Sequence, residues 1–173
     1  GTGAMTAAAH CLFEKGEKVL VAEAGKFGER WAQIASVRGL EVTTLSAPWG
    51  RAIAPDRVTA ALDADPSIRG VLIQLSETST GVQHPVREIA EITRNRDVML
   101  VADGISSVGI APTPMDEWGV DCLLTGSQKG LMVPPGLALL ALSERAWKRA
   151  EKVAPSCFYF NLLRERDAVR SKN

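Results

Sequence analysis

The sequence predicts a three-layer α/β/α sandwich built around a mainly parallel β-sheet. Short apolar runs, typical of strands, alternate along the chain with helical patterns. These runs are apolar throughout rather than alternating with polar residues, which indicates strands that helices cover on both faces. The chain has 173 residues, of which 46% are hydrophobic, so it is large enough for one such domain with its own core.

Glycine and proline mark the ends of several expected elements. Gly16 ends an Ala-rich first helix, and Gly39 follows the second helix at a position typical of a left-handed cap. Pro55 is suited to the first turn of the third helix. The expected strands are 18–22, 41–45, 70–75, 98–102, 121–125 and 137–142. The expected helices are 5–13, 27–38, 55–62, 85–93, 115–118, 144–153 and 161–169.

The balance of charges restricts the class of partner. The chain carries 20 Lys and Arg against 20 Asp and Glu, which argues against nucleic acid or an anionic membrane as its main partner. No apolar run approaches the ~18 residues that a transmembrane helix needs. The three cysteines are odd in number and widely spaced, so they predict a reducing, cytoplasmic compartment rather than a disulfide framework or a metal site.

Glycine-rich and polar loops follow the expected strands, at the edge where α/β folds build their sites. The sequence Gly1-Thr2-Gly3 opens the first helix, where free N–H groups and the positive end of the helix dipole attract a phosphate. Asp103 directly follows a buried strand. Because burying a carboxylate is unfavourable without a cation or donors, Asp103 is expected either to cap its loop or to hold a positive charge on a ligand.

Lys129 lies between glycines at the mouth of a core strand, whereas the other lysines are in helices, polar turns or the tail. A lysine in this place can act as a nucleophilic amine, although a solvated loop lysine is the ordinary alternative. Thr78 belongs to a hydroxyl cluster that either shapes a turn or contacts a ligand. Phe27 begins the second helix, where its ring either joins the core or offers a stacking face.

Six motifs occur in order along the chain. They are Gly1-Thr-Gly-Ala, Gly25-Lys-Phe-Gly-Glu-Arg30, Glu77-Thr-Ser-Thr-Gly-Val82, Val101-Ala-Asp-Gly-Ile-Ser-Ser107, Gly126-Ser-Gln-Lys-Gly130 and Pro134-Pro-Gly136. This series resembles the large domain of class V pyridoxal-phosphate (PLP) aminotransferases, which have fold type I. It is most similar to the alanine–glyoxylate and serine–glyoxylate (serine–pyruvate) aminotransferases. The resemblance covers essentially the whole chain.

The resemblance implies a role in cofactor binding for each matched residue. Lys129 would form a Schiff base with the PLP aldehyde, and Asp103 would pair with the pyridinium nitrogen. Phe27 and Ile105 would pack against the two faces of the ring, and Thr78 would hydrogen-bond on the side of its 3-oxygen. The phosphate would be held by Thr2, Gly3 and Gln128.

The resemblance also implies an activity and an assembly. The enzyme would transfer an amino group from a small amino acid, such as alanine or serine, to a keto acid such as glyoxylate or pyruvate. It would be a homodimer with shared active sites. Residues 1–173 would form its PLP-binding large domain, without an N-terminal segment and a C-terminal small domain, and would be inactive alone. One departure is Thr6, where many relatives have Glu in the first helix.

Two alternatives to the aminotransferase remain. A class V PLP lyase of the cysteine desulfurase type needs a mobile cysteine, whereas Cys11 and Cys122 lie in an apolar helix and strand and Cys157 lies beside an apolar segment. The Ser-Gln-Lys-Gly motif, instead of a lysine preceded by His, also favours the aminotransferase. A non-catalytic α/β binding module is the other alternative, and it would bind no PLP.

Overall fold

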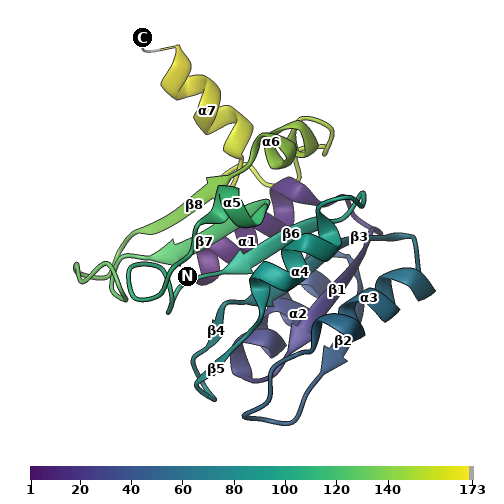
Figure 1. Ribbon diagram of the computed structural model, residues 1–173. Coiled ribbons are helices and arrows are strands. Elements are labelled where there is room, and N and C mark those ends of the chain that lie inside the picture. Colours follow the sequence, from purple (N-terminus) through teal and green to yellow (C-terminus); the bar gives the residue numbers. More distant parts are fainter. Residues whose placement is uncertain (172–173) are drawn as a thin grey trace.

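The computed structural model describes residues 1–171 and places a six-stranded β-sheet between layers of helices (Figure 1). The strands of this sheet are β1 (Lys18–Glu23), β2 (Glu41–Ser46), β3 (Ile68–Gln74), β6 (Met99–Asp103), β7 (Cys122–Gly126) and β8 (Ala138–Leu142). The helices are α1 (Thr2–Leu12), α2 (Lys26–Arg38), α3 (Pro55–Ala64), α4 (Val86–Thr93), α5 (Met115–Trp118), α6 (Glu144–Ala150) and α7 (Leu162–Arg170). A separate hairpin consists of β4 (Ser76–Glu77) and β5 (Val82–Gln83).

The strands of the sheet stand in the order β2-β1-β3-β6-β7-β8. Neighbours from β2 to β7 are parallel, and β8 runs antiparallel to β7. The mainly parallel sheet predicted from the sequence is therefore confirmed. The chain passes from β1 to β2 on one side and then to β3 on the other, so the strand order reverses between β1 and β3. In open α/β sheets, the carboxyl ends of the strands form a crevice at this point.

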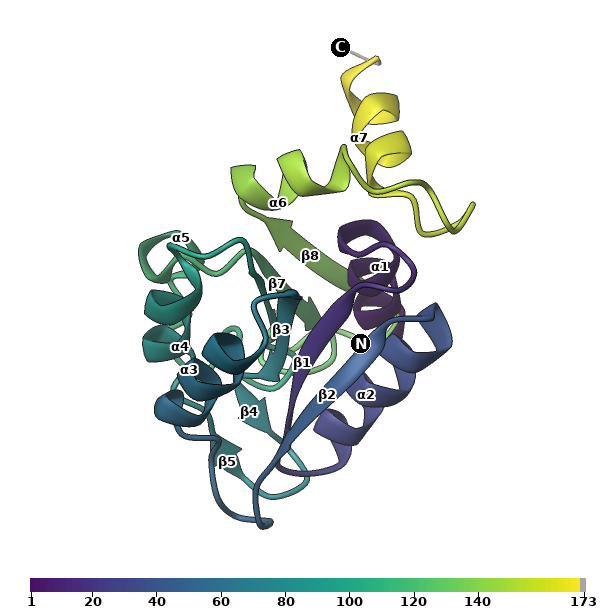
Figure 2. The ribbon, with the colours of Figure 1, turned by 90° about the vertical axis from the view of Figure 1, so that its right-hand side faces the viewer.

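A hydrophobic core lies on each face of the sheet. On one face α1, α2 and α6 contribute side chains such as Met5, Trp31 and Ala146. On the other face α3 and α4 contribute Val58 and Ile89. Figure 2 shows α1 and α2 on one side of the strands and α3 and α4 on the other. The arrangement is the predicted three-layer sandwich, because the strands between the two cores supply apolar side chains to both.

Gly39 and Pro55 mark helix ends as predicted, whereas several other predicted ends are displaced. Gly39 follows α2 with a φ of 85°, in the left-handed region, and Pro55 is the first residue of α3. Helix α1 begins at Thr2 rather than Met5, and α6 ends at Ala150, earlier than expected. The first turn of α1 is therefore formed by the glycine-containing segment itself.

The edge strands contradict the expectation that every strand is apolar and buried on both faces. Thr43 and Thr44 of β2 are exposed, and Leu139 of β8 is 46% exposed. Each edge strand has a neighbour on one side only, and apolar composition does not reveal which strand takes that place. The sequence also did not predict the β4–β5 hairpin, because strands of two residues are too short to show a periodicity.

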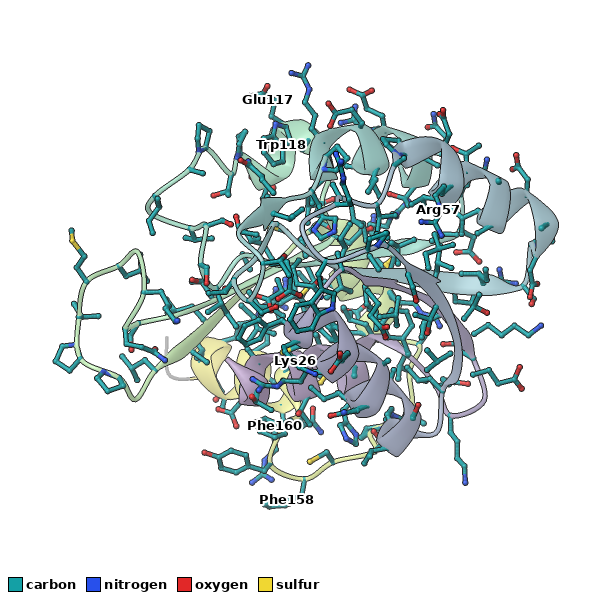
Figure 3. All side chains as sticks on the ribbon, turned by 90° about the horizontal axis from the view of Figure 1, so that it is seen from below. Lys26, Arg57, Glu117, Trp118, Phe158 and Phe160 are labelled. Atoms are coloured by element: carbon teal, nitrogen blue, oxygen red, sulfur yellow. The ribbon has the colours of Figure 1, made fainter. Side chains whose placement is uncertain are left out.

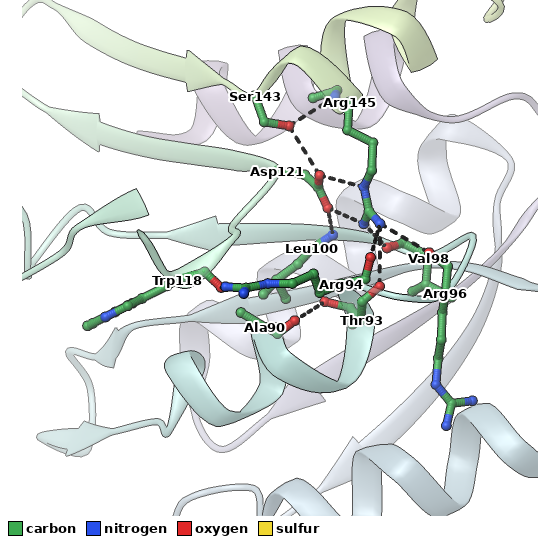
Figure 4. Close-up of polar contacts among 11 residues, drawn as sticks. Ala90, Thr93, Arg94, Arg96, Val98, Leu100, Trp118, Asp121, Ser143 and Arg145 are labelled. Carbon is green, nitrogen blue, oxygen red and sulfur yellow. Dashed lines mark hydrogen bonds and ion pairs between the residues drawn. The ribbon is translucent and has the colours of Figure 1, made fainter. Parts of the chain in front are cut away.

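An ion pair with a buried carboxylate joins several elements at the amino ends of the strands (Figure 4). Asp121 precedes β7, and its side chain is 3% exposed. Arg145 of α6 donates from Nε and Nη2 to the two carboxylate oxygens, at 2.8 and 2.6 Å. Its Nη1 also donates to the backbone carbonyls of Arg94 and Arg96, both at 3.1 Å, just beyond α4. Leu100 of β6 completes the cluster, because its N–H donates to Asp121 at 2.8 Å.

No helix within the described residues 1–171 is long and apolar enough to cross a membrane. Within the same residues, no group of three or more His, Cys, Asp or Glu side chains is arranged to hold a metal ion.

Candidate active site

A cavity of about 200 Å³ lies at the carboxyl ends of β3, β6 and β7 and the start of α1 and α2. The structure brings seven of the eight sequence-predicted site residues to its wall. These are Thr2, Phe27, Thr78, Asp103, Ile105, Gln128 and Lys129. Gly3 instead faces a larger groove between α1, β8 and the segment before α7, where a Cβ on Gly3 would lie 3.6 Å from the Phe160 ring. Figure 3 shows Phe158 and Phe160 on this segment.

Asp103 is the buried acid of the cavity. It ends β6, and its side chain is held by the N–H of Ile105, which donates to Oδ1 at 2.8 Å. Burial raises the pKa of Asp103 to about 6, partly offset by this hydrogen bond and by the charge of Arg30, while the charge of Glu77 raises it further. A carboxyl group with this pKa is readily ionised by a cation placed beside it, because the cation favours the charged form.

A second buried acid, Glu77, fixes the position of Phe27. Glu77 is fully buried, and its Oε2 accepts hydrogen bonds from the N–H groups of Phe27 and Gly28 at 3.1 and 3.0 Å. Ser79 accepts from the N–H of Lys26 at 2.9 Å. The free N–H groups of the first turn of α2 are thus satisfied by the hairpin that follows β3. The carboxylate also complements the positive end of the helix dipole.

Two glycines of the Gly25–Arg30 motif allow this close approach. A Cβ on Gly25 would lie 2.7 Å from Cγ of Glu77, and a Cβ on Gly28 would lie 2.7 Å from the carbonyl oxygen of Ala22. Both distances are shorter than real Cβ contacts. The glycine spacing therefore places the start of α2 against β1 and the hairpin, and Phe27 lies between the two glycines.

Arg30 brings a second cation to the cavity and was not predicted as a site residue. Its guanidinium carbon lies 5.0 Å from the centre of the Phe27 ring, within cation–π range. Its Nη1 donates to the hydroxyl of Thr2 at 3.4 Å, which joins α2 to the start of α1. The sequence contained a signal for this residue, since Arg30 lies one helical turn after Phe27 in the same motif.

The start of α1 is open to a ligand. Gly1 is its N-cap, and no side chain of the described residues caps the N–H groups of its first turn. A Cβ on Gly1 would overlap the side chain of Ile105, and a Cβ on Gly126 would lie 3.1 Å from Oε1 of Gln128. The start of α1, the loop after β6 and the loop after β7 therefore meet closely at this helix end. Thr2 and Gln128 are both exposed there.

The loop that carries Lys129 is positioned by backbone packing. Lys129 is exposed in the turn after β7, and the next residue, Gly130, lies against the loop that follows β6. A Cβ on Gly109 would lie 2.8 Å from the carbonyl oxygen of Gly130. The hydroxyl of Ser127 is buried beneath the loop and donates to the carbonyl of Pro134 at 2.7 Å. These contacts hold the loop of Lys129 against the loop that follows Asp103, so both residues lie on one wall of the cavity.

The cysteines lie away from this cavity. Cys122 is fully buried in β7, and burial raises the pKa of its thiol to about 12. Burial also raises the pKa of Cys11 in α1. Neither residue, nor Cys157, is part of the cavity wall. A thiol that burial keeps protonated is a poor nucleophile, so these positions do not favour cysteine-based chemistry.

Sequence and structure comparisons place the chain in a family. The family model for aminotransferase class V matches residues 1–170. The chain belongs to the class V aminotransferases. The family that six motifs predicted is thereby confirmed.

This class V chain has relatives with several names. It is 38% identical over 175 residues to the small subunit of a soluble hydrogenase from Synechococcus sp. (strain PCC 6716), a match that covers 98% of this chain and 45% of the relative. It is 40% identical over 169 residues to an L-aspartate–glyoxylate aminotransferase from Paracoccus denitrificans (strain Pd 1222), covering 94% and 42%. Its structure matches an alanine–glyoxylate aminotransferase from Nostoc sp. with a TM-score of 0.89 and 32% identity, covering 94% and 43%. The chain thus spans less than half the length of each relative.

Proposed function

We propose that the complete protein is a PLP-dependent aminotransferase that moves an amino group from a small amino acid, such as alanine or serine, to a keto acid such as glyoxylate or pyruvate. The observation that carries this proposal is the meeting of Lys129, Asp103 and Phe27 around one cavity. An amine, a buried carboxylate and an aromatic face match the aldehyde, the ring nitrogen and the ring plane of PLP.

The remaining walls of the cavity also fit PLP. The uncapped first turn of α1 offers N–H donors and a positive dipole end to the phosphate, and Thr2 and Gln128 add polar side chains. Thr78 is available on the side of the 3-oxygen, and its hydroxyl lies 2.5 Å from that of Ser106. Gly3 would contribute to the phosphate site through its backbone, since its Cα faces the groove beside Phe160.

Bound PLP would supply an electron sink for the bond electrons released at the α-carbon of the substrate. The residues of the chain would supply position and proton transfer. Asp103 would hold a positive charge at the ring nitrogen, while Phe27 and Ile105 would fix the ring plane from its two faces. Nζ of Lys129, freed when the substrate amine takes its place, would accept the proton from the α-carbon and return it to the carbon on the other side of the substrate nitrogen, which is general acid–base catalysis by one amine.

The names of two relatives support glyoxylate as the amino acceptor. The Paracoccus and Nostoc proteins are both named for glyoxylate, although one is named for aspartate and the other for alanine as donor. The acceptor is therefore the better supported half of the substrate pair. Alanine, serine and aspartate are the donors to compare.

A transamination assay of the complete protein tests the proposal. The three donors are paired with glyoxylate and with pyruvate, and product formation is followed for the wild type, Lys129→Ala and Lys148→Ala. We expect Lys129→Ala to abolish activity, because no other amine replaces the proton carrier. Lys148 is the matched control, since its side chain is 74% exposed on α6, outside the cavity. Full activity in Lys129→Ala would contradict the proposal.

The same preparation tests the two alternatives. Release of sulfide from cysteine, without transamination, would identify a lyase of the cysteine desulfurase type. A protein that develops no yellow chromophore with PLP would be a non-catalytic binding module. Cys122 is fully buried and Cys11 is partly buried, and burial raises the pKa of both thiols, which favours the aminotransferase over the lyase.

We further propose a homodimer in which the partner completes each site, and a 1–173 segment that is inactive alone. Large apolar side chains are exposed on the loop between β7 and β8, next to Lys129. Met132 is 89% and Leu137 is 70% exposed, and the loop projects from the sheet in Figure 1. We expect Met132→Glu with Leu137→Glu to shift the complete protein to monomers in sedimentation experiments. Val37→Glu, at an isolated position that is 88% exposed, should leave the mass unchanged.

The compartment that we propose is the cytoplasm. Cys11, Cys122 and Cys157 are free thiols in the structure. Free thiols of this kind persist in a reducing environment. A fractionation of the source cells tests this location.

A further inference from the structure

Gln74 is a buried amide without a hydrogen-bond partner. It ends β3, its side chain is fully buried, and neither Nε2 nor Oε1 is bonded to any atom of residues 1–171. Buried polar side chains almost always have partners, because leaving one unpaired is unfavourable. We therefore expect a hydrogen-bond partner close to the side-chain amide of Gln74.

The register of the sheet places Asp103 beside Gln74. The two residues are direct partners in the parallel pair β3–β6, two residues beyond the pair Leu72–Val101. Both Leu72 and Val101 belong to the core on the face of α1 and α2. Because side chains alternate along a strand, Gln74 and Asp103 both point to this same face. Neighbouring strands are only about 4.8 Å apart, so the two side chains leave the sheet side by side.

The carboxylate of Asp103 has room for another donor. Its side chain is 4% exposed, and within residues 1–171 its one hydrogen bond is the contact of Oδ1 with the N–H of Ile105. A carboxylate has about four lone-pair sites, so most of its accepting capacity is unused. An unpaired donor and an underused acceptor thus occupy neighbouring positions on one face of the sheet.

We propose that Gln74 is a positioning residue for Asp103, whose carboxylate accepts a hydrogen bond from one buried water that in turn accepts from Nε2 of Gln74. The bond holds Asp103 in its ionised form and aims its free oxygen at the cavity. That the ionised form serves a ring nitrogen of PLP rests on the proposed function, whereas the contact between Gln74 and Asp103 does not. A single buried water between two polar groups would be nearly as effective as a direct bond.

Other charged groups also face Asp103 and must be separated from this effect. Arg30 of α2 and Glu77 of β4 both act on its pKa, and Lys129 lines the same cavity. None of these changes when Gln74 is replaced by an apolar residue of similar length.

His84 is the competing partner for the amide. Its ring is 3% exposed, and neither ring nitrogen is bonded to an atom of the described chain. Burial lowers the pKa of His84, while the backbone carbonyl of Gln74 and the charge of Glu77 raise it. If the Gln74 amide bonded to this ring instead, replacing Gln74 would alter the titration of His84 rather than that of Asp103.

The test measures the pKa of Asp103 in the complete protein prepared without cofactor, by NMR of its carboxyl carbon, with Asp103→Asn to assign the signal. Gln74→Met removes the amide and keeps the unbranched chain. We expect the pKa of Asp103 to rise by about one unit, because a hydrogen bond to a charged acceptor favours the ionised form by about that much. Thr125→Val is the matched control.

Thr125 suits this purpose because its hydroxyl is also buried and unpaired within residues 1–171. It lies next to Leu124, which points to the face of α1 and α2, so the side chain of Thr125 points to the opposite face. The Thr125→Val protein should keep the wild-type pKa of Asp103.

Two results would overturn the proposal. One is an unchanged pKa of Asp103 in Gln74→Met, and the other is a shift at His84 without one at Asp103. Melting of both variants shows whether they are folded. Since no cofactor is present, the outcome is independent of whether the complete protein is an aminotransferase.

Discussion

At the scale of single residues, two buried acids organise the cavity in different ways. Asp103 has few donors and a raised pKa, whereas Glu77 is held by the backbone N–H groups of Phe27 and Gly28. The sequence predicted Asp103, because an acid directly after an apolar strand stands out. It did not predict Glu77 or Arg30 as site residues, because their contacts with Phe27 depend on how the hairpin and α2 meet.

Asp103 should make stability depend on pH in the cofactor-free protein. Burial raises its pKa from 3.8 to about 6, so the folded form binds this proton more tightly than the unfolded chain. Ionisation therefore lowers the free energy of unfolding as the pH rises from about 4 to about 6, by roughly 3 kcal/mol in total. Urea unfolding across this range should show the loss in the wild type but not in Asp103→Asn.

An exposed acid provides the control for this pH effect. The side chain of Asp97 is 83% exposed, so Asp97→Asn should retain the wild-type pH dependence. Equal pH dependence in the wild type and Asp103→Asn would show that burial does not raise the pKa of Asp103.

Glu77→Gln should weaken the start of α2. The carboxylate accepts hydrogen bonds at both oxygens, from Phe27 and Gly28 at Oε2 and from Ser79 at Oε1. A glutamine has one oxygen, so its NH₂ group would face one of these sets of donors. We expect the free energy of unfolding to fall by about 1–3 kcal/mol, measured by urea titration. Glu29→Gln, on the exposed side of the same helix beside Lys26, should change it little. Similar stabilities of the two variants would mean that the carboxylate does not anchor this helix end.

At the scale of elements, periodicity and apolar runs were sufficient for the strands of the parallel sheet. The burial of β2 and β8 was not predictable in the same way, because exposure at an edge depends on the strand order. The β4–β5 hairpin was also missed, and yet it carries Glu77. Its two-residue strands are defined by hydrogen bonds between residues rather than by a pattern within either strand.

The ion pair of Asp121 and Arg145 should be one of the main determinants of stability at the end of the sheet opposite the cavity. Removing Arg145 would leave a carboxylate that is 3% exposed without its cation. We expect Arg145→Met to lower the free energy of unfolding by about 3 kcal/mol or more. Arg87→Met, which removes an exposed pair with Glu91, should have an effect below about 1 kcal/mol. Equal losses in the two variants would contradict this assignment.

At the scale of the whole molecule, a sandwich with two cores positions the loops after β1, β3, β6 and β7 at the carboxyl edge of the sheet. The motifs predicted the family because each loop is a short, recognisable run of glycines and polar residues in the sequence. They could not show how the loops contact one another, such as the packing of Gly109 on Gly130. The chain spans less than half the length of each of these relatives, so the substrates and the assembly of the complete protein remain proposals.

We propose that Lys129 binds PLP covalently in the complete protein. The most direct measurement is reduction of the PLP-loaded protein with borohydride, followed by digestion and mass spectrometry of the labelled peptide. We predict a reduced phosphopyridoxyl group on Lys129 and none on the exposed Lys148. A labelled peptide that carries the group on another lysine, or no stable adduct at all, would show that Lys129 does not bind the cofactor.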